Sequence, residues 1–270
     1  MTLSFDDRFL FFDTETTGID PERDRIVELG AAYFENRVFT EHRRMLVNPG
    51  IPIPAEASAV HGITDERVAD KPPFSEIAHA FVAHLDGSAY GGDPPSPPLI
   101  GGYNARDYDA PLVNAELERA GIHFAIDETR IFDPIVFVRY HLRHLRHRTL
   151  SAIAEAMGVR LLNAHSAVAD AVATGEIFFK MIERGMIPND PDEALRVQEV
   201  LARRVDEEWE RYSYWLYHHR STGELHMGAG KYCGLPLAEV DPGYLDYLIG
   251  TLTDLPREVR DAFEATLKRR

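Results

Sequence analysis

Residues 9–18 read FLFFDTETTG, in which four apolar side chains precede two carboxylates and a small polar turn. Four consecutive apolar residues are typical of a strand buried on both faces. Asp13 and Glu15 are two positions apart, so their side chains point to the same side of that strand. Such a pair is costly because the carboxylates repel each other and lose hydration, unless a cation or protons compensate. The alternative is a strand that merely runs into an acidic turn.

The composition is that of a globular protein with one good core and room for a second small domain. Of the 270 residues, 44% are hydrophobic and 27% are charged. No apolar run is long enough to cross a bilayer, so we expect no membrane association. The single cysteine, Cys233, excludes an internal disulfide and fits a cytoplasmic protein. The net charge of -15 argues against a large non-specific duplex-binding surface.

Strands followed by helices predict a mixed sheet with helices on its faces. We expect the first three strands to form a meander, followed by a helix and a fourth short strand. A series of helices then continues to residue 182. The first expected strand begins at Phe9 and ends in the small residues 16–18, and the other expected strands are 26–34, 38–47 and 99–103. The expected helices are 74–85, 110–120, 132–145, 150–157 and 167–182.

Two prolines divide the sequence into an expected first domain, residues 1–185, and a second unit, residues 194–270. Pro188 and Pro191 mark residues 186–193 as a linker. A helix is expected over 194–218, and its end is rich in tyrosine and tryptophan. These aromatic side chains either pack against the next unit or form a surface that stacks bases.

Acidic residues from three parts of the chain are expected to form one site. Asp13 and Glu15 end the first strand, Asp109 begins the helix after the fourth, and Asp170 lies one turn inside a later helix. Ligands of open α/β sheets gather beyond the carboxyl ends of strands. Carboxylate oxygens select Mg²⁺ or Mn²⁺ rather than zinc. His165, five residues before Asp170, can take a proton from a water whose pKa a metal lowers.

The order of these residues resembles the DEDDh 3′–5′ exonuclease family. The resemblance covers roughly residues 8–182 and implies an α/β fold of the ribonuclease H-like type. The stretch 61–64, which reads HGIT, is similar to a tetrapeptide of the proofreading-subunit-like branch. The matching motifs are Asp13-x-Glu15, Tyr108-Asp109 after Asn104, and His165-x4-Asp170.

The resemblance implies a role for each matched position. Asp13, Glu15 and Asp170 would hold one of two Mg²⁺ or Mn²⁺ ions beside the attacking water. Asp13 would also touch the second ion, which Asp109 would support, and His165 would be the general base. The alternatives are that His165 is a helix-end histidine favoured by packing and that Asp109 only answers the helix dipole.

Substrate contacts are expected from seven further positions. Backbone groups of residues 16–18 would meet the terminal 3′-hydroxyl, so that the enzyme acts on ends. His61 either contacts the nucleotide or is structural, and Ile63 either stacks on the terminal base or packs inward. The seven positions are Thr16, Thr17, Gly18, His61, Ile63, Asn104 and Tyr108.

Two further segments bear on nucleic-acid binding. Residues 139–148 hold four arginines and three histidines, which form either a solvated helix face or phosphate contacts. Residues 225–250 resemble the small C-terminal α+β module of exonuclease X-like proteins, through motifs that include Gly230-Lys231-Tyr232. Ala229 and Cys233 depart from that pattern, which leaves Lys231 and Tyr232 as weak candidates for gripping nucleic acid.

Together the resemblances imply a metal-dependent 3′–5′ exonuclease that releases nucleoside 5′-monophosphates. The expected partners are single-stranded or frayed 3′ ends, with DNA favoured over RNA. One alternative is a 3′–5′ exoribonuclease of the same family. Another is a proofreading or binding module associated with a polymerase, and a partner in polymerisation or DNA repair stays open.

Overall fold

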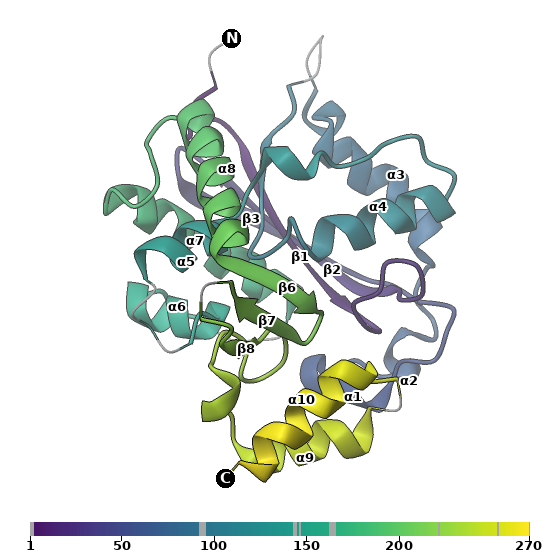
Figure 1. Ribbon diagram of the computed structural model, residues 1–270. Coiled ribbons are helices and arrows are strands. Elements are labelled where there is room, and N and C mark those ends of the chain that lie inside the picture. Colours follow the sequence, from purple (N-terminus) through teal and green to yellow (C-terminus); the bar gives the residue numbers. More distant parts are fainter. Residues whose placement is uncertain are drawn as a thin grey trace.

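The computed structural model describes residues 3–91, 96–142, 145, 147–161, 166–220, 222–252 and 254–269, leaving out the side chains of residues 204–212. Its centre is a five-stranded mixed sheet with the strand order β3-β2-β1-β4-β5 (Figure 1). β1, β2 and β3 form the expected antiparallel meander, and β4 and β5 run parallel to β1. The strands are β1 (Phe9–Thr16), β2 (Ile26–Glu35), β3 (Val38–Leu46), β4 (Leu99–Gly101) and β5 (Ile131–Phe132).

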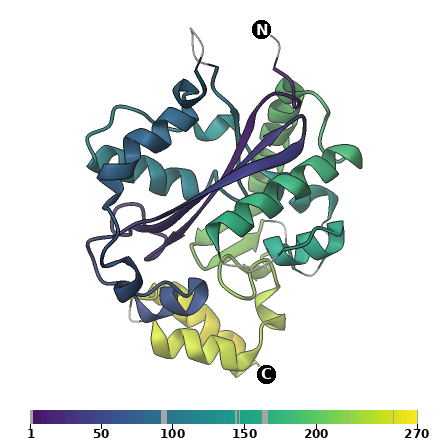
Figure 2. The same ribbon diagram turned by 180° about the vertical axis from the view of Figure 1, so that it is seen from behind.

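Helices cover both faces of this sheet, which confirms the expected α/β class with a ribonuclease H-like arrangement. Seen from behind, α7 runs across the sheet (Figure 2). No helix in the described part of the chain is long and apolar enough to cross a membrane. The helices are α1 (Ala55–His61), α2 (Asp65–Val68), α3 (Phe74–Leu85), α4 (Asp109–Arg119), α5 (Pro134–His141), α6 (Leu150–Met157), α7 (Ala167–Glu183) and α8 (Pro191–Glu208).

The side chains of β1 alternate between two cores. Phe9 and Phe11 pack in one cluster with Phe178 of α7, at ring-centroid distances of 5.3 and 5.5 Å. Leu10 and Phe12 belong to a second cluster on the opposite face, with α3 and α4. Because successive strand residues point to opposite faces, this alternation also decides which way the residues after Phe12 point.

Two glycines allow α7 to approach the sheet closely. A Cβ on Gly30 of β2 would lie 2.2 Å from the carbonyl carbon of Ala167, in the first turn of α7. A Cβ on Gly175 would lie 2.3 Å from the ring of Phe34. Since real Cβ atoms do not approach other atoms so closely, the contact of α7 with β2 depends on both glycines.

The second unit has its own sheet and its own apolar core. Its strands follow the order β6-β7-β8 and pair antiparallel. The core gathers side chains such as Leu216, Leu245 and Phe263. The elements are β6 (Trp209–Ser213), β7 (Leu216–His219), β8 (Leu225–Met227), α9 (Pro242–Thr251) and α10 (Arg257–Lys268).

The helix expected over residues 194–218 is wrong beyond Glu208. There the chain enters a hairpin, in which Ser213 Oγ accepts hydrogen bonds from the N–H groups of Trp215 and Leu216. Aromatic residues favour strands, so the aromatic run that we assigned to a helix end instead forms β6 and β7.

α8 begins at Pro191, inside the segment expected to be a linker, and it packs with the first unit. Ala194 and Leu201 are buried in the same cluster as Phe9. Gln198, fully buried, donates to the Ile131 carbonyl and accepts from the N–H of Asp133, both at 2.8 Å. The division of the chain at residues 186–193 stays a prediction.

We expect Gly30→Ala to destabilise the protein by about 1–3 kcal/mol, because its new methyl group meets backbone that cannot rotate away. Gly250→Ala is the matched control, since a Cβ on this α9 glycine would meet nothing within 4 Å. Replacing this helical glycine by alanine should raise the free energy of unfolding by about 0.5–1 kcal/mol. Urea unfolding measures both, and equal effects would contradict the close approach of α7.

Candidate metal and catalytic site

Three carboxylates meet where β1 ends against α7. Asp13 and Glu15 continue the face of β1 on which Phe11 packs against α7, and Asp170 lies in the first turn of that helix. Ligand oxygens of the three residues all lie within 4.8 Å of one another. The alternation of the strand therefore points two acids at Asp170, which lies 157 positions after Asp13 and 155 after Glu15 in the chain.

Asp109 approaches the same strand end from the other face. It is the first residue of α4 and is buried. One of its carboxylate oxygens accepts hydrogen bonds from the N–H of Thr14 at 2.8 Å and from the Thr14 hydroxyl at 2.6 Å. Because Thr14 lies between Asp13 and Glu15, these bonds fix Asp109 next to the other acids.

Burial raises the pKa of every carboxyl group on β1 and α4 in the cluster. Desolvation is the largest cause, and it raises the pKa of Asp13 well above its usual range and that of Glu15 to about 8. Repulsion from neighbouring acids, including Asp170, adds to both shifts. The pKa of Asp109 rises only to about 6, because the hydrogen bonds from Thr14 oppose the effect of burial.

These shifts mean that the charged site is unfavourable without a cation. Carboxylate oxygens that face one another at short range, with little water, are the donor set of a hard divalent ion. Asp13, Glu15 and Asp170 thus fit a divalent metal on their chemistry and geometry, with Asp109 beside them.

His165 lies outside the described residues, as do Leu162, Asn163 and Ala164. Its role as general base stays a prediction. The chain is described again from Ser166, the N-cap of α7.

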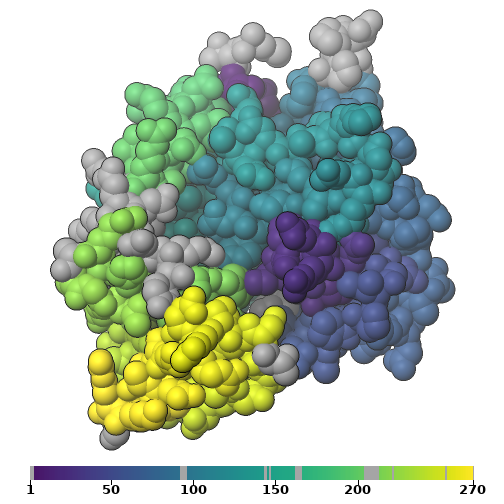
Figure 3. Space-filling view, turned by 45° about the vertical axis from the view of Figure 1, so that its right-hand side comes forward, coloured from purple at the N-terminus to yellow at the C-terminus, as the bar shows by residue number. Residues whose placement is uncertain are grey.

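The loop after β1 folds back on itself through Asp24. The hydroxyl of Thr17 donates to Asp24 at 2.9 Å, and the N–H of Thr17 donates to the carbonyl of Arg25, also at 2.9 Å. Gly18 leaves the room that the Asp24 carboxylate occupies, because a Cβ there would lie 2.4 Å from it. The Thr17 N–H is thus used within the loop, whereas we expected it to meet substrate. Residues from the beginning of the sequence, coloured purple in Figure 3, lie at the surface above the yellow C-terminal helices.

His61 and Ile63 lie at the end of α1 and just beyond it. Ile63 is buried in a small apolar cluster with Val27, Ile53 and Val68. His61 Nδ1 accepts a hydrogen bond from the N–H of Ile63 at 3.0 Å, which shapes the turn. Inward packing therefore accounts for Ile63, and the nucleotide contact of His61 stays a prediction.

Asn104 is held by a buried acid that we did not predict as part of the site. Asn104 has a φ of 62°, and its N–H donates to the Asp133 carboxylate at 2.8 Å. The same carboxylate caps α5, and burial raises its pKa to about 7. The Asp133-Pro134 pair at a helix start was the available sequence signal. Arg139 donates to the Asn104 side chain at 3.4 Å.

Tyr108 joins the candidate site to the second unit. Its ring lies edge-on to that of Tyr214, at a centroid distance of 6.2 Å. Asp109 follows Tyr108 directly, so the second unit approaches the end of the sheet at which the carboxylates lie. The substrate contacts expected of Asn104 and Tyr108 stay predictions.

The basic segment 139–148 is described only in part, since Arg143, His144 and Arg146 lie outside the described residues. Burial lowers the pKa of Arg148, and its carbonyl accepts a hydrogen bond from the Tyr103 hydroxyl at 2.5 Å. In the second unit, the backbone N–H of Lys231 donates to the Tyr244 hydroxyl at 3.1 Å.

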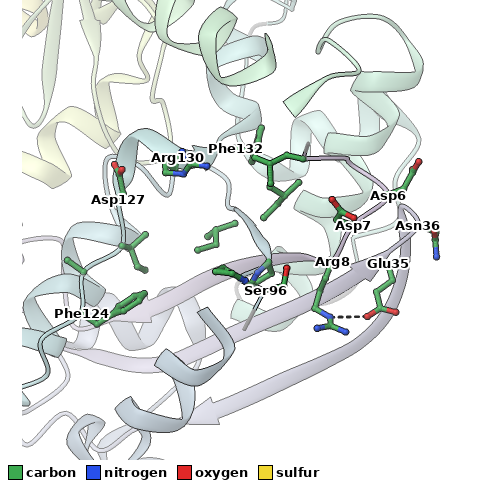
Figure 4. Close-up of a pocket in the computed structure, with 17 residues that line it drawn as sticks. Asp6, Asp7, Arg8, Glu35, Asn36, Ser96, Phe124, Asp127, Arg130 and Phe132 are labelled. Atoms are coloured by element: carbon green, nitrogen blue, oxygen red, sulfur yellow. Dashed lines mark hydrogen bonds and ion pairs between the residues drawn. The ribbon is translucent and has the colours of Figure 1, made fainter. Parts of the chain in front are cut away.

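A separate hollow lies at the opposite end of β1 (Figure 4). Arg8 donates to Glu35 at its edge, at 2.9 Å. None of the four clustered acids lines this hollow. The carboxylates therefore define the candidate site, and this hollow is distinct from it.

Comparison with known proteins identifies the family. The model of the exonuclease family named RNase T matches residues 10–178. The chain belongs to this exonuclease family.

The relatives differ in how much of their own length the chain covers. The chain is 34% identical over 205 residues to the DNA polymerase III subunit epsilon of Rickettsia prowazekii (strain Madrid E), covering 69% of this chain and 80% of that protein. A DNA polymerase III PolC-type of Caldanaerobacter subterraneus subsp. tengcongensis is 30% identical over 181 residues. That match covers 67% of this chain but only 12% of the polymerase, and two other relatives are likewise covered over only 12% and 18% of their length.

Solved structures share the fold. Exonuclease X in complex with 5′ overhanging duplex DNA is 19% identical, with a TM-score of 0.50, over 70% of this chain and 99% of that one. The nuclease domain of 3′hExo, a DEDDh family member bound to rAMP, is 16% identical with a TM-score of 0.56, over 68% and 95%. E. coli exonuclease I in complex with a dA16 oligonucleotide is 18% identical with a TM-score of 0.55, over 93% and 61%.

The raised pKa of Glu15 predicts that the metal-free protein loses stability as the pH rises from 5 to 8. The folded chain keeps a proton up to pH 8 or so, whereas unfolded glutamate releases it near 4.5. This contribution is complete below the unfolded pKa and is lost as the pH passes the folded pKa. The melting temperature of metal-free protein should therefore fall across this range.

Glu15→Gln should flatten that dependence, because glutamine does not titrate. Comparing variant with wild type isolates Glu15 from other shifted acids such as Asp133. Mg²⁺ should raise the melting temperature more at pH 8 than at pH 5, since protons compete with the ion. An unchanged slope in Glu15→Gln would contradict the assignment.

Proposed function

We propose that this protein is a metal-dependent 3′–5′ exonuclease that hydrolyses the last phosphodiester bond and releases nucleoside 5′-monophosphates. The observation that carries the proposal is the gathering of Asp13, Glu15 and Asp170 within 4.8 Å, with Asp109 held beside them. Membership of the exonuclease family and the likeness to epsilon subunits support the same reaction.

The cofactors that we propose are two Mg²⁺ or Mn²⁺ ions. Asp13, Glu15 and Asp170 would hold one ion, and Asp13 would also touch the second ion, which Asp109 would support. When bound, such ions supply a water that ionises near neutral pH and stabilise charge on the leaving 3′ oxygen. The residues of the chain hold the acids in place: Thr14 orients Asp109 through two hydrogen bonds. His165 would act as the general base and accept the proton of the attacking water.

The substrate that we propose is a single-stranded or frayed 3′ end, with DNA favoured over RNA. Two structures of similar fold, those of exonuclease X and exonuclease I, are complexes with DNA. The structure of the 3′hExo nuclease domain is bound to rAMP, which keeps the exoribonuclease as the second candidate. The four carboxylates do not by themselves distinguish deoxyribose from ribose, so the choice between DNA and RNA needs an assay.

A polymerase or repair partner is a further proposal, supported by the epsilon and PolC-type relatives. Gel filtration of the protein with candidate polymerases tests it. Co-elution supports a proofreading role, and separate elution supports a free exonuclease.

Oligonucleotides labelled at the 3′ or the 5′ end, made of DNA or RNA, test the reaction directly. With Mg²⁺, release of labelled mononucleotide from the 3′ label and a ladder from the 5′ label are expected. The better substrate identifies the sugar.

Asp13→Asn should abolish turnover, because this acid would contact both ions. It should also raise the melting temperature without metal, because one repulsive charge is removed. Activity within about tenfold of wild type would exclude this role for Asp13.

His165→Ala should lower kcat by roughly 10²–10⁴-fold, the range for a positioned general base. It should still bind Mn²⁺ with near-normal affinity, because the proposed ligands are all carboxylates. Calorimetry with Mn²⁺ and a pH–rate profile of variant and wild type give both measurements. Loss of Mn²⁺ binding would instead make His165 a ligand, and unchanged rate would make it structural.

A further inference from the structure

Glu28 is a buried carboxylate beside the site that the four acidic positions of the motif do not include. It is 1% exposed and lies within β2 among the buried residues Ile26, Val27 and Leu29. In the β1–β2 ladder it stands directly opposite Glu15. Burying a further acid next to a repulsive cluster is costly, so its bonds need an explanation.

Those bonds connect three elements. Arg44 of β3 donates from Nη2 to Glu28 Oε2 at 2.6 Å, across the sheet. The hydroxyl of Ser166, the N-cap of α7, donates to the other carboxylate oxygen at 3.4 Å. The Arg44 bond is short and charge-assisted, whereas the Ser166 bond is long and depends on how α7 is packed.

The packing at this point is tight. Glu28 and Gly30 are two residues apart and share a face of β2. Ala167 lies against Gly30 so closely that a Cβ would collide with its backbone. The start of α7 is therefore held by contact at Gly30 and by the carboxylate at Glu28.

Ser166 passes this position on to a proposed metal ligand. Its carbonyl accepts a hydrogen bond from the N–H of Asp170 at 3.0 Å, and this bond lies in the first turn of α7. Its hydroxyl is the group that contacts Glu28. A displacement of Ser166 therefore moves Asp170 relative to Asp13 and Glu15.

We propose that Glu28 is a positioning residue that fixes the first turn of α7 through Ser166 and thereby sets the place of Asp170 in the site. Arg44 balances its charge and orients it from the other side. The consequence for turnover rests on the proposed function. Partners one step beyond metal ligands are typically worth 10–100-fold in metal affinity or activity.

A competing explanation is that Glu28 acts only through its negative charge. Glu28→Gln separates the two, because its amide oxygen can accept from Arg44 while its NH₂ group donates to the Ser166 oxygen. It keeps both contacts and removes the charge. Glu28→Ala removes contacts and charge together.

Three measurements apply to each variant: hydrogen exchange at residues 167–171 of metal-free protein, Mn²⁺ affinity by calorimetry, and kcat with KM. For Glu28→Ala we expect faster exchange at Asp170, and Mn²⁺ affinity and kcat each lowered by roughly 10–100-fold with KM little changed. Glu28→Gln should stay close to wild type in all three.

Ser166→Ala tests the same link from the helix side and keeps the test usable if Glu28→Ala does not fold. It should shift exchange and Mn²⁺ affinity in the same direction by a smaller factor. The double variant with Glu28→Ala should be no worse than Glu28→Ala alone, because both break one connection.

Equal losses in Glu28→Gln and Glu28→Ala would overturn the proposal in favour of charge. Unchanged exchange at the first turn of α7 in both Glu28→Ala and Ser166→Ala would also overturn it. Failure of the wild type to degrade any oligonucleotide would refute the proposed function instead, while exchange and Mn²⁺ binding would still decide the role of Glu28.

Discussion

Repulsion among carboxylates at the end of a buried strand is the constraint on which the rest of the structure depends. Asp13 and Glu15 are pushed into a low-dielectric space facing Asp170, where burial and like charge raise their pKa values. Such a cluster lasts only if the surrounding fold is rigid. The packed phenylalanines of β1 and α7 supply that rigidity: Phe9 and Phe11 stack with ring centroids 4.4 Å apart, and both pack against Phe178 of α7. The favourable packing of the core thus compensates for the unfavourable free energy of burying these acids together.

Because the side chains of β1 alternate, groups on both faces of the strand contribute to the site. One face carries Asp13 and Glu15 towards α7, and the other carries Thr14, which holds Asp109 of α4. Close approach of α7 at Gly30 then brings in Asp170. No single element contains the site, so its geometry depends on how two helices pack on one strand.

The second unit lies at the end of the sheet towards which β1 runs (Figure 1), and Asp13 and Glu15 are near that end of β1. The ring of Tyr214 lies edge-on to that of Tyr108, the neighbour of Asp109. This contact connects the unit to the segment that carries Asp109. Removing it would therefore expose surface next to Asp109 as well as remove a separate core.

The sequence by itself determined the family, the order of the first three strands and the identity of the clustered acids, because strand alternation and motif spacing are local properties. It misled us where the aromatic run after Glu208 forms strands, since pairing partners decide between helix and hairpin. Only the tertiary structure placed Glu28 against Ser166, Asp133 against Asn104 and the Thr17 N–H within its own loop. Those roles depend on which distant segments become neighbours, and burial then sets what each polar group must bind.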